Sequence, residues 1–123
     1  MPIQADIDHP KRLITETYTG AIRLEDILAS KKEQLEGDPL VGYSLIVDMS
    51  HARLLMELDD LQQLVDYFRA FKPYIQNTRV ALVSGTASET AISYMYRELV
   101  NSGNLGFEVN VFTTLKAAQS WVG

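Results

Sequence analysis

The sequence predicts an α/β domain with a mixed five-stranded sheet, in which an N-terminal antiparallel hairpin precedes strands that run parallel. Two apolar segments, 45–47 and 80–83, lack polar alternation, which is typical of central strands covered on both faces. Segments of helical periodicity separate the later strands, so these strands are expected to pair in parallel through right-handed crossovers. The expected order is ββαβαβαβα, with about four helices in a single domain over residues 1–123.

The N-terminal hairpin is predicted from two extended segments, 3–7 and 13–18. A turn-like stretch, Asp8-His9-Pro10-Lys11, separates them, and the second segment is rich in the residue types that suit a pleated strand. Gly20 is expected to end this second strand.

The first helix is expected to begin near Leu24. Its apolar face is formed by Leu24, Ile27, Leu28 and Leu35. Lys31 and Lys32 lie in its later part, where positive charge suits the helix dipole. The segment Gly37-Asp38-Pro39 is expected to stop the helix.

The middle of the chain predicts a buried strand over 43–49 and a loop over 50–58. Asp59 and Gln62 have the spacing of a capping box at the start of the next helix. Pro73 is expected to end that helix, because the residue before a proline disfavours helical backbone.

The last part of the chain predicts a helix, a strand and a short helix after the buried strand 80–83. Thr86 and Glu89 have the spacing of a second capping box. This helix is expected to stop at 101–103. Alternation over 107–111 indicates a strand with one wetter face, near the sheet edge. A short terminal helix is expected from Thr114.

The composition excludes several classes of protein. The chain has no cysteine, which excludes disulfides, thiolate nucleophiles and iron–sulfur clusters. The net charge of −5 argues against nucleic-acid binding, since phosphate contacts come largely from Lys and Arg. The longest apolar run has four residues, so no membrane span is expected. The chain begins without the pattern of a signal peptide, and a cytoplasmic location is expected.

Polar residues follow both buried strands, at the carboxyl ends where open α/β sheets usually hold ligands. These candidate residues for contact with a ligand or partner are Asp48, Ser50, His51, Ser84, Thr86 and Ser88.

The first loop contains the residue types of a hydrolytic triad, but without the small residues that flank the serine of a nucleophile elbow. Capping by Asp48 and Ser50, with His51 in solvent, is the alternative that the spacing favours. The second loop could bind an anion at a helix N-terminus, or its hydroxyls could serve as caps. No catalytic residue is therefore assigned.

No metal site or cofactor is expected. Asp6, Asp8 and His9 cluster on a predicted hairpin turn, where solvation is the favoured interpretation, and no metal-binding motif occurs.

Aromatic side chains offer two further possibilities. Tyr94, Met95 and Tyr96 could line an apolar pocket with Phe68 and Phe71, or form ordinary core with one exposed ring. Trp121 could anchor an interface or cover the end of the sheet.

Four segments carry a resemblance to a known family. They are Gly20–Ile27, Tyr43–Asp48, Arg79–Val83 and Val111-Phe112 leading into Leu115–Trp121. With the element order, they resemble a SpoIIAA-like domain of the STAS superfamily, which includes anti-sigma-factor antagonists. The resemblance covers nearly all of residues 3–122. It is closest to a stand-alone bacterial branch that is also compared with CRAL-TRIO lipid-carrier domains.

The resemblance implies a SpoIIAA-like fold and two kinds of function. The antagonists carry a phosphorylatable serine at a helix start, within a motif of which Asp48-x-Ser50 is kept here. At the corresponding helix start, Glu57–Leu61, acidic residues replace the phosphoacceptor. The expected function is non-enzymatic regulation or protein binding, with a protein partner or a homodimer. The alternatives are a small carrier of a lipid-like or other apolar ligand and, less favoured, a Ser/His hydrolase.

Overall fold

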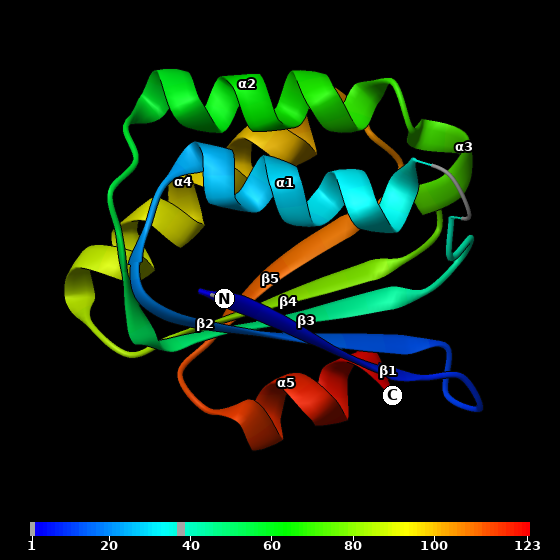
Figure 1. Cartoon of the computed structure of the whole chain (residues 1–123), viewed down its shortest axis with the longest axis horizontal. Coiled ribbons are helices and arrows are strands. Elements are labelled where there is room, and N and C mark those ends of the chain that lie inside the picture. Colours follow the sequence, from blue (N-terminus) through cyan, green and yellow to red (C-terminus); the bar gives the residue numbers. More distant parts are fainter. Residues whose placement is uncertain (1, 37–38) are drawn as a thin grey trace.

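The computed structural model describes residues 2–36 and 39–123. Its centre is a five-stranded sheet in the order β1-β2-β3-β4-β5 (Figure 1). The strands are β1 (Ile3–Asp8), β2 (Leu13–Ile22), β3 (Ser44–Leu54), β4 (Arg79–Ser84) and β5 (Glu108–Phe112). The helices are α1 (Leu24–Leu35), α2 (Leu58–Arg69), α3 (Lys72–Ile75), α4 (Ala87–Gly103) and α5 (Leu115–Val122).

Strand pairing confirms the predicted mixed sheet. β1 pairs with β2 in antiparallel orientation, and β2, β3, β4 and β5 pair in parallel. Helices α1, α2 and α4 cover one face of the sheet, and α5 lies on the other (Figure 1). The crossover helices share one face because right-handed crossovers lie on the same side when successive strands advance in one direction across the sheet. β5 lies at the sheet edge, as its alternation predicted.

Gly20 does not end β2, which corrects the prediction from its sequence. The strand continues to Ile22, and Gly20 pairs with Ala52 of β3. Its φ of +72° is a conformation that glycine adopts without the strain of a side chain. Gly20 therefore bends the strand without interrupting its pairing. The helix stop predicted at Gly37-Asp38 lies outside the described residues.

β3 is longer than predicted, because most of the segment assigned to a loop continues the strand. β3 reaches Leu54, and its pairing with β2 shifts register after Asp48. Two residues of β3, Met49 and Ser50, face only Tyr18 in this register, which is the pattern of a β-bulge. The bulge changes the phase of the strand, so Ala52 lies in the same core as Met49.

Two helix boundaries also differ from the predictions. Glu57, and not Asp59, is the N-cap of α2, with a capping box completed by Asp60. α2 ends at Arg69, and Pro73 lies in the first turn of the short helix α3, which begins at Lys72. A proline is tolerated in the first turn because that N–H has no helical partner. This helix raises the number of helices above the four expected.

The N-caps of the last two helices come from threonines. The Thr86 and Thr114 side chains accept hydrogen bonds from the backbone N–H groups of Glu89 and Ala117. This confirms the helix starts that were predicted near these threonines.

Two hydrophobic clusters flank the sheet. The larger one joins the sheet to α1, α2 and α4. The smaller one contains Ile46, Ala81, Val83 and Ala118 beneath α5, and Trp121 packs against it. The Trp121 ring lies 5.6 Å from that of Phe112 and so covers the sheet on the α5 side.

Candidate functional site

The two polar loops predicted as candidate sites are neighbours in the structure. Met49 of β3 pairs with Ser84 of β4, and Gly85 packs so tightly on Ser50 that a Cβ there would lie 2.8 Å from the Ser50 carbonyl oxygen. A side chain at position 85 would therefore separate the two loops. The tertiary structure brings the two segments together, but only the second follows the end of its strand. The first lies within β3, which continues to Leu54, so its predicted position at a strand end is wrong.

In the first segment, which belongs to β3, the polar groups bind one another. One carboxylate oxygen of Asp48 accepts hydrogen bonds from the Ser50 backbone N–H at 3.0 Å and from the Ser50 Oγ at 2.6 Å. His51 is exposed and lies next to Thr19 in the sheet. The carboxylate thus binds the serine directly, whereas in a hydrolytic triad it would orient the histidine.

In the second loop, the hydroxyls bind within their own helix and strand. Ser84 is buried and its Oγ lies 2.6 Å from the Thr90 Oγ1. Thr86 caps α4, and Ser88 is exposed in the first turn of that helix. These contacts explain Ser84 and Thr86 structurally, and anion binding at this loop stays a prediction.

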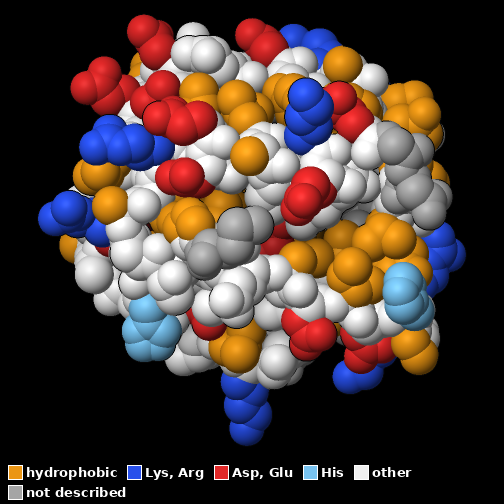
Figure 2. Space-filling model, in the orientation of Figure 1, with side chains coloured by type: hydrophobic (Ala, Val, Ile, Leu, Met, Phe, Trp, Pro, Cys, Tyr) orange, Lys and Arg blue, Asp and Glu red, His pale blue; other side chains and the backbone are white. Residues whose placement is uncertain are grey.

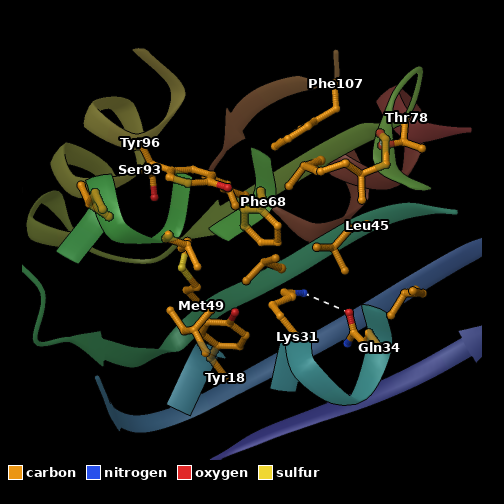
Figure 3. A pocket seen from close by; sticks show the side chains of 18 of the residues that line it. Tyr18, Lys31, Gln34, Leu45, Met49, Phe68, Thr78, Ser93, Tyr96 and Phe107 are labelled. Carbon is orange, nitrogen blue, oxygen red and sulfur yellow. Dashed lines mark hydrogen bonds between the residues drawn. The ribbon is translucent and has the colours of Figure 1, made fainter. Parts of the chain in front are cut away.

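A pocket of about 110 Å³ lies inside the larger hydrophobic cluster, between the sheet and the layer of α1, α2 and α4 (Figure 3). We call it the core pocket. None of the six predicted contact residues lines it. Most of its wall is aliphatic or aromatic, and its representative members are Ile14, Val47, Leu64, Phe68, Leu82 and Phe107. Side chains of this kind, with a few fixed polar groups, are typical of a small-molecule site.

One side of the core pocket is built on a buried ion pair. The Lys31 Nζ of α1 lies 2.8 Å from both carboxylate oxygens of Glu16, and these residues are 4% and 0% exposed. Gln34 Oε1 accepts a further bond from Lys31 Nζ at 3.1 Å (Figure 3). The position of Lys31 late in α1 was predicted from the helix dipole alone, and the structure adds that its charged end is buried against Glu16.

The Glu16 carboxylate accepts additional hydrogen bonds from residues around the pair. Its donors besides Lys31 are the Ser30 hydroxyl at 3.3 Å, the Tyr18 hydroxyl at 3.5 Å and the Gln34 Nε2. A buried carboxylate that is both paired and hydrogen-bonded avoids the large free-energy cost of an isolated buried charge.

A second group of polar side chains comes from α4. Ser93 is 1% exposed and lines the core pocket, and among the described residues its Oγ has no hydrogen-bond partner. Tyr96 lies one turn later on the same helix and extends its hydroxyl into the pocket beside Phe68 (Figure 3). Burial, and then the nearby Glu16 carboxylate, raises the pKa of Tyr96, so its hydroxyl keeps its proton at neutral pH.

The sequence contains a signal for this site that was not among the predicted candidate residues. Glu16 alternates with Ile14 and Tyr18 on one face of a strand, and Lys31 lies four residues from both Ile27 and Leu35 on the apolar stripe of its helix. A charged residue in each of two apolar patterns indicates a buried pair. Of the aromatic residues predicted to line a pocket, Phe68 and Tyr96 do so, whereas Tyr94 is 46% exposed.

The acidic net charge of the sequence is visible on the surface. Acidic side chains gather over α2 at the upper left of the face in Figure 2, where its first turn contains Asp59 and Asp60.

His9 bonds to the Tyr43 hydroxyl at 2.7 Å, and no group of His, Cys, Asp and Glu among the described residues could hold a metal. Within the same part of the chain, no helix has the length and apolar character needed to cross a membrane.

Comparisons with known proteins identify the fold. No protein-family model matches the sequence, and no curated protein matches it. A crystal structure of an uncharacterized protein of the DUF3478 family from Shewanella loihica PV-4, described as having a SpoIIAA-like fold, matches with a TM-score of 0.60 and 16% sequence identity. The match covers 98% of this chain and 92% of that chain. Identity at this level shows the fold alone. The chain therefore has the SpoIIAA-like fold that its sequence resembled.

Proposed function

We propose that this domain acts by binding a small, mainly apolar molecule in the core pocket, without catalysing a reaction on it. The observation that carries the proposal is a pocket of about 110 Å³ lined by side chains of the larger hydrophobic cluster. Protein interiors contain few voids larger than a water molecule. A pocket of this size deprives the surrounding side chains of packing contacts, and a ligand that fills it would restore them.

The volume of the core pocket limits the size of the ligand. An engineered apolar cavity of about 150 Å³ binds benzene, whereas sites for drug-sized ligands occupy about 300–1,000 Å³. A pocket of about 110 Å³ therefore suits a single ring or a short branched chain. A long acyl chain is larger than this volume, which makes a small ligand the better fit than a lipid.

Binding can be tested by nuclear magnetic resonance with the isotope-labelled protein, using benzene and hexadecanoate as probes of different size. Benzene is expected to shift the amide signals of residues beside the pocket, such as Val47 and Leu82, and to leave Ala118 on the α5 side unchanged. Hexadecanoate is expected to produce no such pattern. A protein that binds neither probe would overturn the proposal.

The proposal of binding without catalysis is supported by the arrangement around Ser50. The Ser50 hydroxyl donates its hydrogen bond to Asp48. His51 is therefore not oriented as a base for that serine. A fluorophosphonate probe is therefore expected to leave Ser50 unlabelled while it labels a serine hydrolase added as a positive control. Stoichiometric labelling of Ser50 would revive the hydrolase hypothesis.

A second candidate function, contact between two copies of this chain, is supported by an exposed apolar face. Leu58, Tyr94 and Met95 are 46%, 46% and 40% exposed and border a shallow groove between α2 and α4. Arg97 lies over the Tyr94 ring and Glu98 borders the groove, so a two-fold contact would bring opposite charges of the two copies together.

Sedimentation equilibrium tests the homodimer. The wild-type protein is expected to dimerise, and Met95→Glu is expected to dissociate the dimer by placing a charge in the apolar face. The matched control is Leu115→Glu, which changes an exposed leucine on α5 and should leave the dimer intact. A wild-type monomer at all concentrations would refute this second candidate.

A further inference from the structure

We propose that the ligand of the core pocket is an uncharged molecule with one hydroxyl or carbonyl group, and that Ser93 is the residue that binds this group. The inference rests on the proposed function, because it requires that the pocket be occupied. It depends on which polar atoms of the pocket wall are already satisfied and which are not.

The charged groups at the pocket leave no net charge for a ligand to neutralise. Lys31 Nζ has three N–H bonds, and the structure gives it three acceptors, the two oxygens of Glu16 and the Gln34 Oε1. Glu16 in turn accepts from Ser30, Tyr18 and Gln34 as well as from Lys31. A carboxylate or ammonium group on the ligand would enter an apolar space without a counter-ion, at a large cost in free energy.

The other polar groups of the wall differ in what they have left to bind. The Thr78 Oγ1 donates to the Ile75 carbonyl oxygen at 2.6 Å, and Gln34 is bound to Lys31 and Glu16. Ser93 Oγ is the one buried side-chain oxygen or nitrogen among residues 2–36 and 39–123 that has no partner. A buried hydroxyl without a partner is unusual in a folded protein, and a ligand can supply the missing bond.

The position of Ser93 allows such a bond. Its side chain lines the core pocket together with that of Tyr96, whose hydroxyl lies farther along, beside Phe68 (Figure 3). A serine hydroxyl is both a donor and an acceptor, so it can bind either a carbonyl or a hydroxyl of the ligand. The aliphatic wall around Val47, Leu64 and Leu82 would enclose the apolar remainder of the molecule.

Three probes of the same ring size separate the contributions of shape, hydrogen bonding and charge: benzene, phenol and benzoate. Their affinities are measured by nuclear magnetic resonance titration of the wild type, of Ser93→Ala and of the control Ser102→Ala. Ser102 lies on the same helix, is exposed, and bonds to the Glu98 carbonyl oxygen. Ser93→Ala removes no hydrogen bond, so this variant is expected to fold.

The wild type is expected to bind phenol at least as tightly as benzene, although an apolar cavity would penalise the phenol hydroxyl. Ser93→Ala should weaken phenol binding about fivefold or more, because the phenol hydroxyl then has no partner in the pocket. The same variant should change benzene binding by less than about twofold, because benzene has no hydroxyl. Benzoate should bind at least about tenfold more weakly than phenol. Ser102→Ala should match the wild type.

The outcomes distinguish this inference from the function on which it rests. If benzene binds while Ser93→Ala leaves phenol affinity unchanged, the role of Ser93 is overturned and the binding function stands. Tight binding of benzoate would overturn the uncharged class of ligand. If none of the three probes binds, the proposed function itself falls, and the inference falls with it.

Discussion

On the α5 side of the sheet, Ala81 and Ala118 are fully buried and let the helix approach the strands closely. On the side of α1, α2 and α4, three helices rest on larger side chains and leave a pocket of about 110 Å³. The buried ion pair of Glu16 and Lys31 also lies on this second side. One sheet thus has a face covered closely by a single helix and a face that leaves a pocket, and the second is the face for which we propose binding.

The largest effect is expected from breaking the ion pair on the pocket side. Glu16→Gln keeps the shape of the side chain but leaves the Lys31 ammonium buried without its counter-ion, which should lower the free energy of unfolding by about 3–5 kcal/mol. Urea denaturation measures this change. Replacing both residues, Glu16→Leu with Lys31→Met, should recover most of the loss.

The control for that experiment is Glu33→Gln on the exposed side of α1, which should change stability by less than about 0.5 kcal/mol. A loss below about 1 kcal/mol for Glu16→Gln would contradict the description of this pair as buried and fully bonded.

The tyrosines of the pocket side should make the protein sensitive to alkali. Burial, and then the nearby Glu16 carboxylate, raises the pKa of Tyr18 well above its ordinary value of 10 and also raises that of Tyr96. In the unfolded chain both ionise near pH 10, so stability is intact below pH 10 and falls as the pH rises further, by about 2–3 kcal/mol at pH 11.

Denaturation at pH 8 and pH 11 measures this loss, and Tyr96→Phe should reduce it by about half. Absorbance of ionised tyrosine provides the internal control, since these two rings should ionise only as the protein unfolds. If they ionise before unfolding, the pocket side is more open to solvent than the structure indicates.

A matched pair of substitutions compares packing on the two faces directly. Val83→Ile adds one methylene beneath α5, where overpacking should destabilise the protein by about 1 kcal/mol or more. Val47→Ile adds the same group at the core pocket, where free space should make it neutral or stabilising by up to about 0.8 kcal/mol. Thermal unfolding distinguishes them, and equal losses from both would mean that the two faces are equally packed.

The smallest effect is expected at the polar segment of β3. Ser50→Ala removes the hydroxyl bond to Asp48 at an exposed position, while the backbone N–H of residue 50 still binds the same carboxylate. The loss of stability should be about 0.5 kcal/mol, and benzene binding to the core pocket should not change. Weaker benzene binding in this variant would show that this segment and the pocket are coupled.

Local patterns predicted most of the fold and little of the site. The order of the elements and the pairing of the strands were predicted from three patterns. These are the alternation in β5, the unbroken apolar runs of β3 and β4, and the apolar stripes of the helices. The β-bulge at Ser50 was not predicted, because only pairing with β2 reveals the extra residue. The polar residues Asp48 and Ser84 lie on adjacent strands, but their side chains are used within the fold.

The layers of this protein can be derived from residue order alone, because the periods of strands and helices record which side of each element is buried. The bond from Lys31 to Glu16, fifteen residues earlier in the chain, and the missing partner of Ser93 become visible only in three dimensions. Such features depend on how separate elements fit together in three dimensions. A void and an unsatisfied hydroxyl are properties of that fit, and no residue pattern along the chain encodes them directly.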